Sequence, residues 1–139
     1  TVIGRGASYA SAAMGALLIE EAAKLTCEPL TGGQFRHGPL ELVRDGFRAI
    51  VFLGEGEARP LTEALLARIA ALGGRAVSIG IEPGPPSPAV LPVALPGLPP
   101  TLLPIAEIIP VQYFVIPLAL ARGFEPAVFV NAQKVTTGE

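Results

Sequence analysis

The sequence has few cysteines, histidines and lysines, and each scarcity excludes a class of function. Its 139 residues contain one cysteine, one histidine and no tryptophan. The lone Cys27 excludes an internal disulfide framework and fits a reducing compartment, so we expect a cytoplasmic protein with Cys27 in its core. The formal net charge of -2 leaves no basic surface to attract nucleic acid or anionic lipid, and we expect neither as a partner.

The start of the sequence has neither the basic residues of a signal peptide nor an initiator methionine, so no signal peptide is expected in it. It opens directly on Thr1 and an apolar run, so we expect it to be part of a longer protein. Residues 101–120 are long enough to span a bilayer. Three prolines interrupt this stretch and Glu107 puts a charge in its middle, which favours a buried helix of a soluble protein with a broken start.

What is present points to one densely packed α/β domain covering residues 1–139. Half of the residues are hydrophobic, 50%, and only 16% are charged. Short apolar runs at 1–4, 25–30, 47–53, 75–80 and 90–95 are expected strands. Helix-forming stretches at 10–24, 60–72 and 101–123 separate or follow them, and an irregular tail runs from 124 to 139. This alternation predicts a three-layer α/β/α fold with a mostly parallel sheet of about five strands.

The turn Gly4-Arg5-Gly6-Ala7-Ser8 joins the first expected strand to the first expected helix. Such turns lie where parallel sheets bind ligands, and their amides and the helix dipole suit a phosphate. We expect Gly4, Arg5, Gly6 and Ser8 to contact the ligand, with Ser8 also a candidate N-cap. A third fingerprint glycine and a Walker lysine are missing, so no nucleotide cofactor is predicted. The alternative is a tight turn with only a structural role.

The only histidine, His37, stands between Arg36 and a Gly38-Pro39 pair that forces the backbone to turn. Loops held by glycine and proline often carry binding or catalytic groups, so His37 is a candidate catalytic residue. The alternative is a surface or core histidine without a role. No cluster of ligating residues surrounds it in the sequence, and no metal site is predicted.

Glu21 ends an otherwise apolar helical stripe that begins with Met14 and Leu18. Either it lies at the edge of a cleft, where its pKa would rise and suit a general base, or Lys24 neutralises it at the surface. Neighbouring Glu20 is expected to pair with Lys24 at a spacing of four residues. The opposite, small-residue side of the same helix (Ala12, Ala13, Gly15 and Ala16) predicts close packing against a second copy or a second domain.

The tail carries Lys134, one of only two lysines in the chain. If this tail folds over the ligand face, the desolvated amine of Lys134 could form a Schiff base with a carbonyl, with Gln133 beside it contacting the substrate. The alternative is a frayed C-terminus.

Together these segments resemble the second sugar-isomerase (SIS) domain of the glucosamine-6-phosphate synthase family. The resemblance is carried by Gly4-Arg5-Gly6 with Ser8-Tyr9, by Gly15-Ala16-Leu17 with Glu21, by Phe35-Arg36-His37-Gly38-Pro39, and by the tail from Gly123 to Thr137. It implies a flavodoxin-like fold that binds fructose 6-phosphate or glucosamine 6-phosphate, with a homodimer or a second SIS domain as partner.

The resemblance also implies roles for three residues. Glu21 would move a proton between C1 and C2 of the sugar, Lys134 would form an imine with the open ketose, and His37 would assist ring opening in a neighbouring subunit's site. Met14 and Leu18 stand where the family typically has a glutamate and a lysine. We therefore expect the second SIS half of an aminotransferase or deaminase, inactive by itself, or, as the alternative, a noncatalytic regulatory module that binds sugar phosphate.

Overall fold

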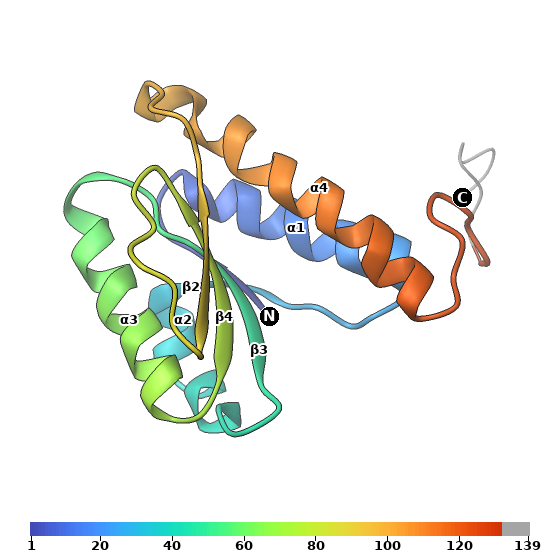
Figure 1. Ribbon diagram of the computed structural model, residues 1–139, viewed down its shortest axis with the longest axis horizontal. Helices are drawn as coiled ribbons and strands as arrows, with labels where there is room; N and C mark the ends of the chain where they lie inside the picture. Colours follow the sequence, from blue (N-terminus) through green and yellow to red (C-terminus); the bar gives the residue numbers. More distant parts are fainter. Residues whose placement is uncertain (132–139) are drawn as a thin grey trace.

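A five-stranded sheet organises the molecule, and all four strand pairs are parallel (Figure 1). The computed structural model describes residues 1–131. The strands are β1 (Val2–Gly4), β2 (Pro29–Thr31), β3 (Arg48–Phe52), β4 (Arg75–Gly80) and β5 (Val90–Ala94). Their order is β2-β1-β3-β4-β5, so the direction of winding reverses between β1 and β3. The predicted parallel sheet of five strands is confirmed.

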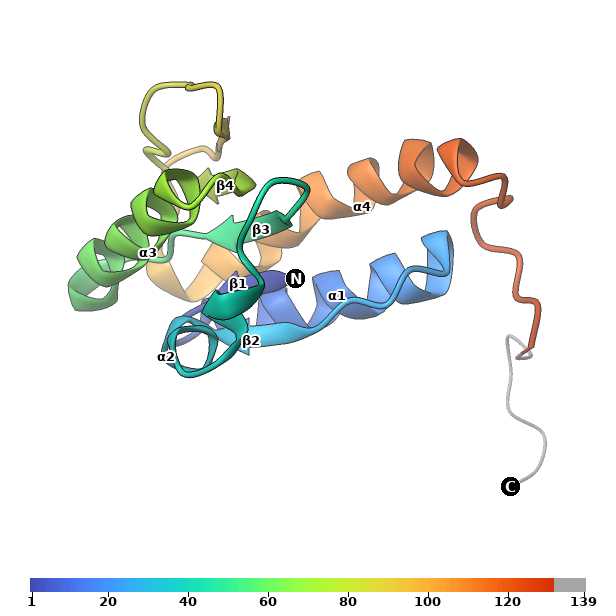
Figure 2. The same cartoon turned by 90° about the horizontal axis from the view of Figure 1, so that it is seen from below.

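Helices cover both faces of this sheet, as the three-layer prediction requires. α1 (Ser8–Ala23) and α4 (Leu103–Ala121) lie side by side on one face, and α3 (Arg59–Ala71) and the short α2 (Gly32–Arg36) lie on the other (Figures 1 and 2). Three 3-10 turns complete the chain: η1 (Pro39–Leu42), η2 (Gly56–Ala58) and η3 (Pro100–Leu102). α2 and these turns were not predicted, because each is shorter than a hydrophobic period can reveal.

Alternate side chains of the central strands belong to two apolar clusters, one on each face of the sheet. Val2, Ile50 and Phe52 face α1 and α4, whereas Ile3 and Val51 face α2 and α3. Apolar residues on both faces of a central strand produce the continuous hydrophobic runs that predicted buried parallel strands. The burial of Cys27, which is 7% exposed, confirms its predicted core position.

The small-residue side of α1 packs inside the domain, which corrects the prediction that it forms an outer contact surface. Ala12 and Ala16 are 0% and 1% exposed, and a Cβ on Gly15 would lie 3.6 Å from both Val111 of α4 and Val2 of β1. Small side chains let α1 approach α4 and the sheet closely, so this side of α1 is buried inside the domain and is not available to a partner. Met14, at 48% exposed, lies on the outer side of α1.

α4 is continuous from Leu103 to Ala121 although Pro110 and Pro117 lie inside it, so the expected interruption is confined to the 3-10 turn before it. By length and composition the segment Pro100–Ala121 could cross a membrane, a test that core helices of globular proteins also pass. One side of α4 packs on α1, and its outer side carries a row of exposed apolar residues that starts in η3: Leu102, Ile105, Ile109, Tyr113, Ile116 and Leu120. We call this row the α4 apolar stripe.

Candidate functional site

The turn after β1 is closely fitted to the start of α1. A Cβ on Gly4 would lie 2.3 Å from the carbonyl oxygen of Ser8, so only glycine lets the backbone pass there. Gly6 has φ +55°, a left-handed conformation that glycine adopts without strain. The amides of Ser8 and Tyr9 donate to the carbonyls of Arg5 and Gly6, at 3.1 Å each, and are therefore already used within the turn.

Arg5 reaches from this turn to the loop that follows β2. A Cβ on Gly32 would lie 2.5 Å from Arg5 Nε, so the guanidinium lies directly against the first residue of α2. Arg5 Nε is buried and has no hydrogen-bond acceptor among residues 1–131. A buried donor without an acceptor is uncommon in folded proteins, and here it could be satisfied by a bound anion. Arg5 thus links the two loops at the carboxyl edge of β1 and β2.

His37 follows α2 directly, in a loop as predicted. Thr31 begins this short helix with a capping box, in which its hydroxyl accepts from the Gln34 amide at 3.2 Å and Gln34 Oε1 accepts from the Thr31 amide at 2.8 Å. The helix ends at Arg36, the His37 amide donates to the Gln34 carbonyl, and the His37 side chain is exposed. Gly38 has φ +139°, which favours glycine and turns the chain into Pro39. His37 and Arg5 therefore flank opposite ends of one five-residue helix.

Ser8 is not the N-cap of α1, which corrects that prediction. Ala7 occupies the N-cap position without a side-chain hydrogen bond, and Ser8 is the first helical residue. The Ser8 hydroxyl instead donates to Glu107 Oε1 of α4 at 2.8 Å, and both residues are buried. Its hydroxyl is thus committed inside the domain, and its expected contact with a ligand remains untested.

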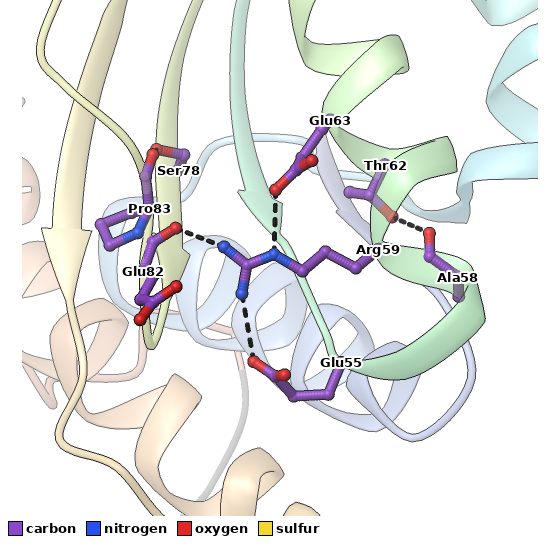
Figure 3. Close-up of polar contacts among 8 residues, drawn as sticks. All are labelled: Glu55, Ala58, Arg59, Thr62, Glu63, Ser78, Glu82 and Pro83. Atoms are coloured by element: carbon purple, nitrogen blue, oxygen red, sulfur yellow. Dashed lines mark hydrogen bonds and ion pairs between the residues drawn. The ribbon is translucent and has the colours of Figure 1, made fainter.

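A second arginine organises the carboxyl edge of β3 and β4. Arg59, at the start of α3, pairs with Glu55 at 3.2 Å and Glu63 at 2.9 Å, and it also donates to the carbonyl of Glu82 (Figure 3). The hydrogen bond that Arg59 donates to the Glu63 carboxylate raises the pKa of Arg59, which stays charged. These contacts hold η2, α3 and the proline-rich connection 81–89 together. Neither Arg59 nor this contact network was predicted.

Glu21 lies at the other end of α1. It is thirteen positions after Ser8, which corresponds to about 20 Å along a helix axis. Its side chain is exposed, and the Lys24 amine donates to the backbone carbonyls of Glu21 and, at 3.0 Å, of Val128. The predicted pairing of Glu20 with Lys24 is wrong. Lys24 has φ +51° after the last helical residue, which turns it off the helical spacing, and Glu20 accepts from the Cys27 amide.

The described part of the tail lies beside this end of α1. Lys24 Nζ is 5.8 Å from the centre of the Phe129 ring, and Arg122 Nε donates to the Ala23 carbonyl at 2.8 Å. Residues 124–131 therefore lie far from the turn after β1 rather than over the carboxyl edge of the sheet (Figure 1). Gln133 and Lys134 lie outside the described residues.

A groove of ≈ 540 Å³ opens at the amino edge of the sheet. Its walls are mainly apolar and include Ile19, Cys27, Val77, Phe114 and Leu118. Burial raises the pKa of the Cys27 thiol, which keeps it protonated. No carboxylate or histidine lines this groove within the described part of the chain, so it offers no acid–base chemistry.

The predicted site residues thus fall into two groups. Gly4, Arg5 and Gly6 gather at the carboxyl edge of the sheet, with His37 one short helix away from Arg5, whereas Glu21 lies at the far end of α1. Sequence reasoning missed Glu107 as a site residue, although it is the only charged residue in the apolar stretch 101–121. A single charged residue in an apolar helix, together with Ser8 and Ser11 on the facing helix as possible hydrogen-bond partners, could have identified Glu107 from the sequence.

The strand order of the sheet by itself indicates the class of fold to which the chain belongs. Parallel sheets whose winding reverses between β1 and β3 bind small ligands in the crevice at the carboxyl ends of those strands. The loops of Arg5 and Gly54 flank this crevice, and a Cβ on Gly54 would lie 3.4 Å from the Ser8 hydroxyl. The fold is therefore that of a doubly wound, ligand-binding α/β domain.

Comparison with known proteins names the family. The SIS domain model matches residues 1–122, and the chain belongs to this family. Glutamine–fructose-6-phosphate aminotransferase (isomerizing) of Pyrococcus horikoshii is 33% identical over 137 residues, which are 99% of this chain and 23% of that protein. The chain thus spans about a quarter of the length of the curated relatives it matches.

Solved structures share the fold. The C-terminal domain of glucosamine-fructose-6-phosphate aminotransferase from Francisella tularensis superposes with a TM-score of 0.82 at 23% identity, over 90% of this chain and 36% of that one. Tagatose-6-phosphate ketose/aldose isomerase from Escherichia coli gives a TM-score of 0.72 at 24% identity, over 95% and 39% of the two chains. The resemblance seen in the sequence is confirmed for family and fold.

Proposed function

We propose that this chain is the second SIS half of an enzyme that binds a hexose or aminosugar 6-phosphate and moves a proton between its C1 and C2. The enzyme would be a glucosamine-6-phosphate synthase-like aminotransferase or a deaminase that runs the reverse chemistry. The names of the relatives, an isomerizing aminotransferase and a ketose/aldose isomerase, support this reaction class.

One observation carries the proposal. The tail that leads to Lys134 lies against the end of α1 that carries Glu21, because Lys24 donates to the carbonyls of both Glu21 and Val128. Lys134 follows Val128 by six residues, and six residues span at most about 20 Å. This reach supports the proposal that the candidate base and the candidate amine act on one substrate.

The chemistry assigned to these groups is consistent. The amine of Lys134 would add to the C2 carbonyl of an open ketose phosphate and release water to give an imine. Ammonia, supplied from outside this chain, would then displace the Lys134 amine from C2, which frees the lysine and leaves an imine of ammonia. Protonation of this imine nitrogen makes a C1 hydrogen acidic, and the Glu21 carboxylate would take this proton from C1 and return it to C2, so that C1 becomes the carbonyl carbon and C2 carries the amine. His37, which is exposed at the end of α2, would assist ring opening in the site of a neighbouring subunit.

The partner would be a homodimeric copy or a second SIS domain. The α4 apolar stripe supports this part of the proposal, because six large apolar residues in a row are costly to leave in water. Half of the phosphate site would come from that partner, so the isolated domain is expected to be inactive. The turn of Arg5 lies about 20 Å from Glu21 along α1, so Arg5 would contact the phosphate of a sugar held across the interface with the partner rather than the sugar on which this chain's Glu21 acts.

The test is isotope exchange between solvent and the C1 hydrogens of fructose 6-phosphate, or the C2 hydrogen of glucosamine 6-phosphate, measured in the intact protein. Glu21→Gln should reduce exchange by about 100- to 10,000-fold, because it keeps the shape but removes the base. Glu20→Gln is the matched control, exposed on the same helix turn, and should retain exchange. Lys134→Ala should abolish trapping of the ketose by borohydride. Equal exchange in both glutamine variants would reject Glu21 as the base.

A specific observation favours the second candidate, a noncatalytic regulatory module. Leu18 packs against the core cluster of α1 and α4, and Met14 is exposed, so the stripe leading to Glu21 offers no polar group to a substrate before Glu21 itself. Tight binding of a hexose 6-phosphate by the intact wild type without isotope exchange would select this function.

A further inference from the structure

Glu107 is the one charged side chain that the described structure buries completely. It is 0% exposed and lies between α4 and the first turns of α1. Its Oε1 is 2.8 Å from the Ser8 hydroxyl, and its Oε2 is 2.7 Å from the Ser11 hydroxyl. The Ser11 hydroxyl is also 3.2 Å from the carbonyl oxygen of Pro104. The cluster thus contains three close oxygen pairs.

Counting protons shows what these three contacts require. A serine hydroxyl has one hydrogen to donate, and a carbonyl or an ionised carboxylate has none. If Glu107 is ionised, Ser11 faces two acceptors, Glu107 Oε2 and the Pro104 carbonyl, and can satisfy only one. If Glu107 is protonated on Oε2, it donates to Ser11, Ser11 donates to Pro104, and Ser8 donates to Oε1. Only the neutral acid satisfies every contact.

The surroundings of Glu107 favour the same protonation state. α1 presents Ser8 and Ser11 to it, the sheet beneath α4 presents apolar side chains, and Glu55 from the loop after β3 adds negative charge nearby. Among residues 1–131, no cation is hydrogen-bonded to it or paired with it. Burial raises the pKa of Glu107 above its ordinary value of 4.5, the serine hydroxyls oppose this shift, and Glu55 adds to it.

We propose that Glu107 is a positioning residue that fixes the turn 4–8 of the candidate site as a neutral carboxylic acid, hydrogen-bonded to Ser8 and Ser11. Ser8 ends this turn, and a Cβ on Gly54 would touch its hydroxyl, so the cluster lies directly below the crevice between β1 and β3. The link from this turn to a ligand rests on the proposed function. The protonation state of Glu107 and its role in fixing the turn are independent of the proposed function.

The test uses two substitutions at one position in the intact protein. In Glu107→Gln, the amide oxygen accepts from Ser8 and the amide NH2 donates to Ser11, so the variant reproduces every contact of the neutral acid. In Glu107→Met, a side chain of similar length leaves both serines without their partner. Ile69→Val, fully buried on the opposite face of the sheet, controls for general loss of stability. Unfolding is measured by denaturant from pH 4.5 to 8, and amide hydrogen exchange by mass spectrometry.

The sign of the pH dependence follows from the raised pKa. The stability that protonated Glu107 contributes is fully present below the ordinary pKa of 4.5 and is lost as pH rises through the higher folded value. The stability of Glu107→Gln relative to the wild type should therefore increase as pH rises. The ratio of the two unfolding constants should change by up to about tenfold per pH unit, until the pH passes the folded pKa of Glu107. A stability difference between Glu107→Gln and the wild type that does not change from pH 4.5 to 8 would show that Glu107 is ionised throughout this range.

Hydrogen exchange tests the positioning role. Exchange of the peptide covering residues 4–11 should rise about tenfold in Glu107→Met, and it should stay at the wild-type rate in Glu107→Gln and Ile69→Val. Equal exchange in all four proteins would overturn the role of Glu107 in fixing the turn. Neither measurement uses a sugar phosphate, so their failure is distinguishable from failure of the proposed function.

Discussion

Gly32 controls the position of the Arg5 guanidinium, and this can be tested with one methyl group. In Gly32→Ala the new Cβ would lie 2.5 Å from Arg5 Nε and 2.6 Å from Arg5 Cζ. The guanidinium must move, because no pair of such atoms approaches this closely. Gly33→Ala is a matched control in the same helix, where the nearest atom to the new Cβ is Thr31 Oγ1 at 3.8 Å.

The magnitude follows from what Arg5 does and does not contact. Its buried Nε has no acceptor among the described residues, so displacement breaks no hydrogen bond at that atom. Both alanines should gain up to about 1 kcal/mol of helix propensity, which cancels in the comparison. If Arg5 binds the substrate phosphate, Gly32→Ala loses one charge-assisted hydrogen bond, worth about 1.5–3 kcal/mol. This corresponds to about 10- to 150-fold in Kd.

The assay is calorimetric titration of the intact protein with fructose 6-phosphate, together with denaturant unfolding of the same variants. Gly32→Ala should bind at least about tenfold more weakly than Gly33→Ala, while the two unfold within about 1 kcal/mol of each other. Equal affinities would refute a role for Arg5 in binding. A large difference in stability would show that the Arg5 position matters for the fold instead.

Two further predictions concern packing. Gly15→Ala should stabilise the domain by about 1 kcal/mol, because its Cβ meets Val111 at 3.6 Å, an ordinary contact, whereas Gly4→Ala should destabilise it by about 3 kcal/mol through a backbone clash at 2.3 Å. Denaturant midpoints that shift in the same direction would contradict this pair. Ile109→Lys and Tyr113→Lys in the α4 apolar stripe should weaken self-association in sedimentation, and Leu61→Lys on α3 should not. Unchanged association in all three variants would exclude the stripe as the contact surface.

The sheet was predictable because its central strands β1 and β3 are buried on both faces. The run from Ala49 to Leu53 is continuously apolar, and β4 was predicted with its observed bounds. The short α2 was not predictable from periodicity. Its capping box, Thr31 with Gln34, was nevertheless legible as a start signal three residues apart.

The candidate site was predicted less well, because its arrangement depends on contacts between distant segments. Ser8 has the residue type of an N-cap, but its hydroxyl pairs with Glu107, 99 residues away. Lys24 has the spacing to pair with Glu20, but a left-handed backbone turns it toward Val128. A local sequence pattern contains no information on these distant partners, so both the N-cap prediction for Ser8 and the predicted pairing of Lys24 with Glu20 were wrong.

The central claim is that the ligand is a sugar phosphate, and titration calorimetry on the intact wild-type protein tests it most directly. Fructose 6-phosphate or glucosamine 6-phosphate should give saturable heat, whereas a dinucleotide and duplex DNA should give none, because the fingerprint glycine is missing and the net charge is -2. Saturable heat with the dinucleotide and none with either sugar phosphate would contradict the account.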